Sequence, residues 1–93
     1  MDVNRAIRLA VNTGETVFGI KEVKKKAGSG ETELIIVSKN CPEPEFKRKK
    51  YKKVPIYVFN SNNQDLGAAA GKPFTISAIG ILNPGESEIL SLK

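Results

Sequence analysis

Residues 67–73, GAAAGKP, contain the glycines and the lysine of a phosphate-binding loop at an unusual spacing. A Walker A loop reads G-x-x-x-x-G-K-[ST]; its glycines let backbone N–H groups surround phosphates, and its lysine contacts the terminal ones. Here the two glycines are one residue too close, and Pro73 replaces the Ser or Thr that would bind magnesium. The spacing therefore argues against a nucleotide site.

The elements expected around these residues are also in the wrong order, because a phosphate loop leads from a strand into a helix. Ser61 and Gln64 form a capping-box pattern that predicts a helix over residues 62–70, ahead of the motif. A predicted strand over residues 75–82 follows it. We interpret Gly71 as the left-handed residue that ends the helix. No nucleotide or other cofactor is expected.

Catalytic and metal-binding residue types are scarce in this chain. It has no histidine and one cysteine, Cys41, so a hydrolytic triad or proton shuttle would need lysine or carboxylate substitutes. Cys41 precedes a possible helix N-terminus, where reactive thiols are found, but it lacks a histidine partner and is better interpreted as a packed, inert thiol. A lone cysteine without histidine also offers no zinc ligand set. We expect neither an enzyme nor a metal site.

Three loops remain as candidates for binding. Residues 19–22 open a predicted helix with free backbone donors, a glycine that allows close approach, and Lys21, an arrangement that suits a phosphate oxygen. Asn40 ends a predicted strand, and its side-chain amide offers the donor and the acceptor that suit a base edge, although asparagine at such a position is as often a turn former. Phe74 suits stacking on an unpaired base if its loop is exposed, whereas most phenylalanines belong to the core.

The net charge of +5 is concentrated in one segment. Residues 47–53, KRKKYKK, hold six of the 15 basic residues, and the remaining nine are balanced by 10 acidic residues. A cationic cluster with an aromatic residue inside it attracts a polyphosphate partner, because neutralised phosphates release counterions. The alternative is that this run is only the solvated face of a helix.

Apolar spacing and capping residues predict alternating helices and strands. Asp2 caps a helix whose apolar residues recur at i, i+3, i+4, i+7 and i+8, and Gly14 ends it. Further helices are predicted over 20–27, 44–53 and 62–70, strands over 16–19, 33–38, 55–59 and 75–82, and a loosely helical tail near the end.

The length of 93 residues fits one domain, residues 1–93. The longest apolar run, residues 34–37, is too short to cross a bilayer. The start, with Asp2 and Arg5 ahead of any apolar block, lacks the layout of a signal peptide. We expect a cytoplasmic protein with no membrane partner.

Four motifs in this order resemble one protein family over nearly the whole chain. They are G-x-K-E at 19–22, N-C-P at 40–42, L-G-x-x-x-G-[KR]-P-F at 66–74 and P-G-E-S-x-I-L at 84–90. The chain resembles the L-seven-Ae and L-thirty-e family of ribosomal and kink-turn RNA-binding proteins. The resemblance implies an α/β fold, a three-layer α/β/α sandwich with a four-stranded mixed sheet. The binding loops meet at one edge only if the last strand opposes the first two.

The resemblance implies recognition of a kink-turn, a sharply bent internal RNA loop with sheared G·A pairs and an extruded nucleotide. Gly19, Lys21 and Glu22 match the helix start that meets the G·A pairs, and Phe74 and Ile76 match the apolar residues on which the flipped-out base packs. The expected RNA-binding residues are Gly19, Ile20, Lys21, Glu22, Asn40, Cys41, Pro42, Lys72, Phe74 and Ile76. Possible phosphate contacts are Lys24, Lys25, Arg48, Lys49 and Lys52.

One residue favours the ribosomal branch of the family, and the length of one segment departs from the family. Relatives that guide RNA modification tend to have asparagine at the position of Lys21, whereas the ribosomal branch typically has lysine. After Pro42 the family usually has about four more residues than this chain, roughly one helical turn, with an acidic and aromatic centre. The predicted third helix is therefore shorter and more basic than in the family.

The expected function is that of a structural constituent of the large ribosomal subunit that binds ribosomal RNA at a kink-turn. Its other expected partners are neighbouring large-subunit proteins, and the free protein is expected to be a monomer in the cytoplasm. Two alternatives stay open: a kink-turn protein of another ribonucleoprotein, and a module whose basic helix docks an acidic protein. RNA binding would be distinguished by its steep weakening with salt.

Overall fold

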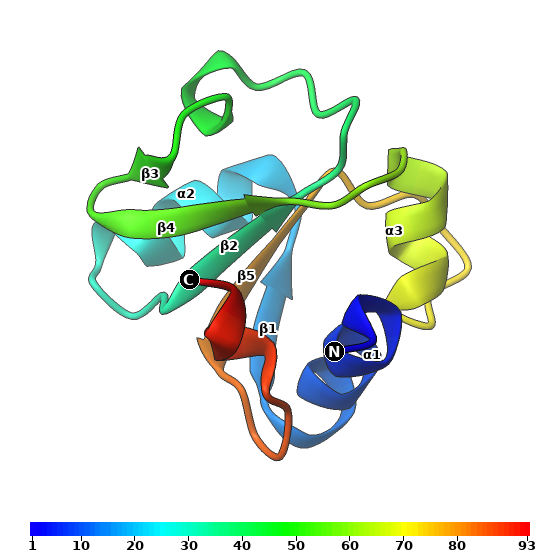
Figure 1. Cartoon of the computed structure of the whole chain (residues 1–93). Coiled ribbons are helices and arrows are strands. Elements are labelled where there is room, and N and C mark those ends of the chain that lie inside the picture. Colours follow the sequence, from blue (N-terminus) through cyan, green and yellow to red (C-terminus); the bar gives the residue numbers. More distant parts are fainter.

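A computed structural model describes the whole chain, residues 1–93. The helices are α1 (Val3–Thr13), α2 (Ile20–Gly28) and α3 (Asn63–Ala69), with short 3-10 helices η1 (Pro44–Phe46) and η2 (Ile89–Leu92). The strands are β1 (Glu15–Phe18), β2 (Leu34–Val37), β3 (Lys50–Tyr51), β4 (Val54–Val58) and β5 (Ala78–Asn83), as Figure 1 shows. None of the helices is sufficiently long and apolar to cross a membrane.

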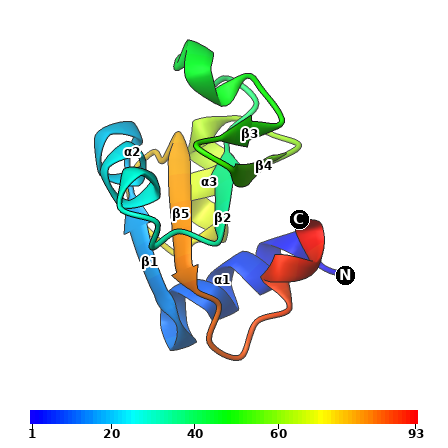
Figure 2. The same ribbon diagram turned by 90° about the vertical axis from the view of Figure 1, so that its left-hand side faces the viewer.

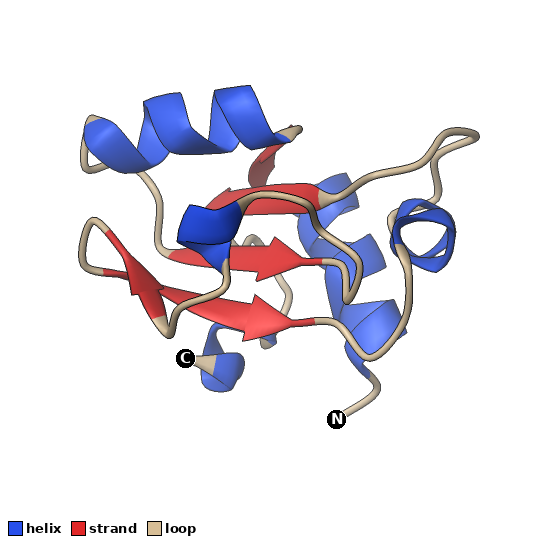
Figure 3. Cartoon of the chain, turned by 90° about the horizontal axis from the view of Figure 1, so that it is seen from above, coloured by secondary structure: helices blue, strands red, loops and turns tan.

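The strands form one mixed sheet in the order β1-β5-β2-β4-β3. Strand β5 lies between β1 and β2 and is antiparallel to both, whereas β2 and β4 are parallel (Figure 3). The mixed sheet and the opposed last strand are confirmed. The expected number of four strands is wrong, because the two residues of β3 add a fifth strand at the edge of β4. The ends of β1 and β2 therefore meet the start of β5 at one edge.

Side chains of β2 point alternately to two apolar clusters, as the period of a strand requires. Leu34 and Ile36 pack with residues of α1, α3, β5 and η2, whereas Ile35 and Val37 pack with α2 and η1. These clusters place α2 on one face of the sheet and α1 and α3 on the other, and Figure 2 shows α2 and α1 on different sides of β5. All four side chains are buried, each contributing about 1.5 to 3 kcal/mol. This burial on both faces holds the sheet edge that carries the loops.

The caps of the helices agree with the sequence except at α3. Asp2 accepts a hydrogen bond from the N–H of Arg5 at 3.2 Å, as predicted. At α3 the cap is Asn62, whose side chain accepts from the N–H of Asp65 at 3.0 Å, so the capping box on Ser61 is wrong by one residue. The Ser61 hydroxyl instead donates to the Asp65 carboxylate. The extended backbone of Asn62 places its side chain over the first turn, which is the geometry of an N-cap.

The predicted helix over residues 44–53 is wrong. Only Pro44–Phe46 form a 3-10 turn, and Lys50–Tyr51 then pair with β4 in a short antiparallel hairpin. Phe46 and Tyr51 are five positions apart, so a helix would not bring them together, whereas in the folded loop their rings meet edge to face at 5.2 Å. Repulsion among neighbouring cations also disfavours a helix here. The hairpin turn places two lysines, Lys52 and Lys53, at positive φ.

Candidate nucleic-acid interface

Gly19 turns the chain from β1 into α2. Its φ of 96° suits glycine, and its N–H donates to the carbonyl of Ala78 on β5 at 3.0 Å. Its own carbonyl accepts from the N–H of Val23, which begins the helical hydrogen bonds of α2. No side chain caps the helix, and Lys21 and Glu22 are exposed on its first turn. The N-terminus of α2 is therefore free to donate hydrogen bonds to an anion or a carbonyl oxygen.

Asn63 at the start of α3 connects the loops on either side of it. Its backbone N–H donates to the Asn40 side chain at 2.9 Å, its side chain donates to the Ser77 hydroxyl at 3.3 Å, and its carbonyl accepts from the N–H of Ile76 at 3.0 Å. The Asn40 oxygen is thereby engaged, which leaves its NH₂ group for a ligand. Sequence analysis missed Asn63 and Ser77. The available signal was the pair Asn62–Asn63, of which only one residue can cap α3.

Phe74 is presented to solvent by the loop between α3 and β5. Its side chain is 54% exposed, although Ile76, two residues later, is buried in the core. The loop backbone lies directly on α3, because a Cβ on Gly67 would be 2.0 Å from the carbonyl oxygen of Phe74. Gly71 ends the helix at φ 78°, as predicted. The exposed ring is thus held on an anchored backbone.

A pocket of about 320 Å³ lies beside this ring. It is lined by Phe18, Gly19, Ile20, Phe74, Thr75, Ile76 and Ser77. The ammonium group of Lys72 lies 5.5 Å from the centre of the Phe18 ring, within the range of a cation–π interaction. The structure thus brings the start of α2 and the loop before β5 together around an apolar pocket with a cation next to it.

The model of the Ribosomal protein L7Ae/L30e/S12e/Gadd45 family matches residues 1–91. The chain belongs to this family. Three archaeal family members are each called "Large ribosomal subunit protein eL30". The protein of Methanococcus maripaludis (strain C5) is 44% identical over 100% of this chain and 92% of its own length. Those of Methanothrix thermoacetophila and Pyrobaculum calidifontis are 37% and 38% identical over 99% of this chain and 89% and 95% of their own lengths.

A solved structure supports the same fold. The chain is similar to a protein with unknown function from Bacillus halodurans C, with a TM-score of 0.79 and 24% sequence identity. The likeness covers 97% of this chain and 93% of the other. The likeness shows that this L7Ae/L30e family member and the Bacillus halodurans protein share a fold.

Cys41 and Pro42 of this L7Ae/L30e family member follow β2 and differ in their exposure to solvent. The Cys41 side chain is buried, and its N–H donates to the carbonyl of Ser38 at 3.1 Å. Pro42 is exposed. The thiol is thus part of the core beside Asn40, and any contact of this motif with a ligand is made by the backbone or by Pro42.

The lysines that were expected to contact phosphates have different surroundings. Lys24 forms ion pairs with Glu43 at 2.6 Å and Glu45 at 2.9 Å, and hydrogen bonds from its ammonium group to these carboxylates raise its pKa. The hydrogen bond from Lys24, together with one from the backbone N–H of Glu45, lowers the pKa of Glu43. The positive charge of Lys24 is therefore balanced by two carboxylates of the protein itself. Lys25, Arg48, Lys49 and Lys52 are exposed and form no ion pair.

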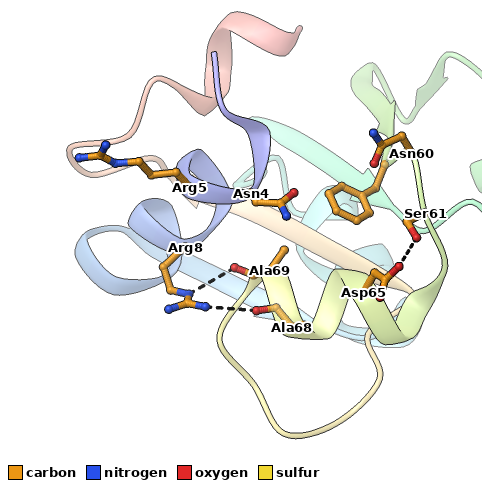
Figure 4. Close-up of a pocket in the computed structure, with 9 residues that line it drawn as sticks. Asn4, Arg5, Arg8, Asn60, Ser61, Asp65, Ala68 and Ala69 are labelled. Atoms are coloured by element: carbon orange, nitrogen blue, oxygen red, sulfur yellow. Dashed lines mark hydrogen bonds between the residues drawn. The ribbon is translucent and has the colours of Figure 1, made fainter.

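The pocket with the largest volume, about 630 Å³, lies between α1 and α3 and contains no expected site residue. Figure 4 shows Arg8 reaching across it to the carbonyls of Ala68 and Ala69, at 3.3 and 3.4 Å. These carbonyls belong to the last turn of α3, where helical acceptors lack partners within the helix; that of Ala68 also accepts from the N–H of Gly71 at 2.9 Å. Arg8 thus connects two helices, and sequence analysis did not identify this contact.

Proposed function

We propose that this chain is a non-catalytic constituent of the large ribosomal subunit in the cytoplasm and binds a kink-turn in ribosomal RNA. Family members that cover the whole chain are called large ribosomal subunit proteins, which supports the ribosomal role. The clusters on opposite faces of the sheet support the expected three-layer, single-domain arrangement. Neighbouring subunit proteins are its other proposed partners, and the free protein is a monomer.

The exposed ring of Phe74 carries the proposal. A core phenylalanine would be buried, whereas this side chain is 54% exposed and adjoins an apolar pocket. A base on an aromatic face contributes about 1 to 3 kcal/mol to binding. The extruded nucleotide of a kink-turn would pack on Phe74, with Lys72 available for its phosphate. Ile76 supports this site from within the core.

The start of α2 would meet the sheared G·A pairs. Gly19 has no Cβ, and a Cβ built there would contact nothing, so the backbone leaves room for a base edge to approach. The free donors of the first turn, the Lys21 ammonium and the Glu22 carboxylate offer both hydrogen-bond donors and acceptors. The NH₂ group of Asn40 adds a donor from the adjacent loop. Base edges require such a mixed set, whereas phosphates require only donors.

The proposal is tested by comparing the affinity for a kink-turn RNA with that for a plain duplex of the same length. We expect a clear preference for the kink-turn, and Lys21→Ala should weaken it by about 1 to 3 kcal/mol, the cost of a lost charge-assisted contact. Arg5→Ala is the matched control, because Arg5 is an exposed cation outside the proposed site. Equal affinity of the unmodified protein for both RNAs would refute kink-turn recognition.

A further inference from the structure

A groove lies between the first part of the basic loop (residues 47–53) and the face of β2 and β4 that packs against η1. Its volume is about 590 Å³. The cations that line it are Lys39, Lys47, Arg48 and Lys49. Its apolar lining consists of Val37, Cys41, Phe46, Ile56 and Val58. Figure 1 shows the segment from η1 to β3 extending beyond the sheet, next to the strand that forms the other wall.

The groove cations have no acidic partner in the protein. The ion pairs of the molecule involve Lys24, Lys26 and Lys93. The two carboxylates closest in sequence to the basic loop, Glu43 and Glu45, are both bound by Lys24 on α2. The positive charge of the groove is therefore not neutralised internally. A polyanion that enters it replaces condensed counterions and gains affinity.

The wall formed by β4 offers apolar surface as well as charge. Strand β3 pairs with Val54 and Pro55, and the N–H of Ile56 donates to the carbonyl of Lys49 at 2.9 Å, so in the second half of β4 the outer edge is open only at Val58. Val58 in this half is 52% exposed, one of the few large apolar side chains in contact with solvent. An RNA duplex presents mainly phosphates and riboses, whereas an unpaired nucleotide also presents an apolar base face. The combination fits an unpaired strand better than a duplex.

The groove adjoins the proposed kink-turn site through two consecutive residues. Lys39 lines the groove, and the next residue, Asn40, is hydrogen-bonded to Asn63 at the kink-turn site. We infer that the groove binds an unpaired RNA strand that continues from the kink-turn, with its phosphates on the cations and its bases against Val58. This inference rests on the proposed function. It assigns the basic loop to a second RNA contact that extends the first.

The test uses a kink-turn RNA with and without an unpaired tail of about six nucleotides at either end. The groove variant carries Lys47→Gln, Arg48→Gln and Lys49→Gln. The control variant carries Lys50→Gln, Lys52→Gln and Lys53→Gln, which remove the same charge from the same loop outside the groove. Lys39 is left unchanged because it adjoins Asn40. Thermal unfolding of both variants checks that the loop remains folded.

We expect the tail to increase the affinity of the unmodified protein and of the control variant, and to have no effect on the groove variant. The slope of log K against log salt for the tailed RNA should become shallower by up to about 2 in the groove variant, since each contact to a single strand contributes about 0.7. Pairing the tail with a complementary strand should remove the gain.

Three results would overturn the inference. They are a tail without effect on the unmodified protein, an equal loss in both variants, and a gain that survives pairing of the tail. A groove that binds a polyglutamate peptide but not the tail would show a protein-docking surface instead, and the inference would be wrong. Kink-turn preference of the unmodified protein over a plain duplex is measured separately, so that failure of this inference is distinguishable from failure of the proposed function.

Discussion

The proposed kink-turn site and the basic loop present two kinds of surface on one molecule. The first is held by hydrogen bonds from Asn63 and by the close contact of Gly67 with the Phe74 loop. The second carries six cations, and it is held mainly by two buried rings. Base contacts specify a nucleic acid, whereas phosphate contacts position it and raise affinity. In our two proposals, therefore, the site selects the RNA and the loop strengthens its binding.

The largest effect expected from a single change is on the stability of the basic loop. Phe46 is 1% exposed and packs on Tyr51, so Phe46→Ala should reduce the free energy of unfolding by about 3 to 5 kcal/mol through the cavity that it leaves. Urea denaturation measures this. A loss below about 1 kcal/mol, the size of an average mutation, would contradict the packing described here.

The anchoring of the Phe74 loop is tested by Gly67→Ala. The added Cβ would clash with the carbonyl oxygen of Phe74, so we expect a loss of about 1 to 3 kcal/mol in unfolding free energy and weaker kink-turn binding. Gly28→Ala is the matched control, because a Cβ there would meet only the Lys52 side chain at 3.9 Å. Similar behaviour of the two variants would show that the loop is not anchored at Gly67.

Phe74→Ala contrasts directly with Phe46→Ala. Because the Phe74 ring is exposed, its removal should leave thermal stability nearly unchanged but weaken kink-turn binding by about 1 to 3 kcal/mol. A kink-turn RNA that lacks the extruded nucleotide should bind both proteins equally. The opposite pattern, a large drop in melting temperature with unaltered affinity, would assign Phe74 to the core.

A smaller effect is expected from the turn of the hairpin. Lys53 has φ 71°, a conformation that costs a side chain about 1 to 2 kcal/mol, whereas glycine adopts it freely but gains entropy when unfolded. Lys53→Gly should therefore raise stability by about 0.5 to 1 kcal/mol, measurable by thermal unfolding. Lys49→Gly, where φ is not positive, should lower it. A destabilising Lys53→Gly would argue against the turn.

The smallest effect concerns the ion pairs that join α2 to the basic loop. The Lys24 ammonium lowers the pKa of Glu43, so this interaction stabilises the protein above the ordinary carboxyl pKa of 4.5 and is lost as the pH falls below it. Lys24→Met should remove that part of the acid dependence of the melting temperature. Ser29 and Lys26 lower the pKa of Glu31 in the unmodified protein and in the Lys24→Met variant alike, so the contribution of Glu31 to the acid dependence is the same in both. Identical curves would show that the pairs contribute nothing.

Much of the fold could be predicted because it follows from local patterns. The apolar spacing of α1, the continuous apolar run of β2 and the left-handed Gly71 each determine their element without help from distant residues. The basic loop could not be predicted in this way. Its conformation depends on Phe46 and Tyr51 finding burial beneath β4 and α2, and no local spacing encodes that contact.

The residues of the candidate site were chosen from sequence motifs, whereas the hydrogen bonds that hold them together could not be foreseen. The motifs indicated Gly19, Asn40 and Phe74, and the exposure of Phe74 agrees with the interpretation chosen for it. The hydrogen bonds of Asn63 and Ser77 join segments that are far apart in sequence, so they emerge only when β5 has inserted beside β2. The ion pairs of Lys24 were missed for the same reason, because its carboxylate partners lie on another segment.

The position of β5 has a consequence for synthesis of the protein. It is the last strand in the sequence, yet it separates β1 from β2, which have no other hydrogen-bonded neighbour in common. A ribosome makes the chain from its N-terminus, so the first helices and strands leave the exit tunnel before the strand that joins them exists. Pairing across such sequence distances is slow compared with local helix formation. A chain that ends before residue 78 contains the whole basic loop but lacks the Ala78 carbonyl that accepts from the N–H of Gly19, so the proposed kink-turn site is the part of the molecule that is completed last.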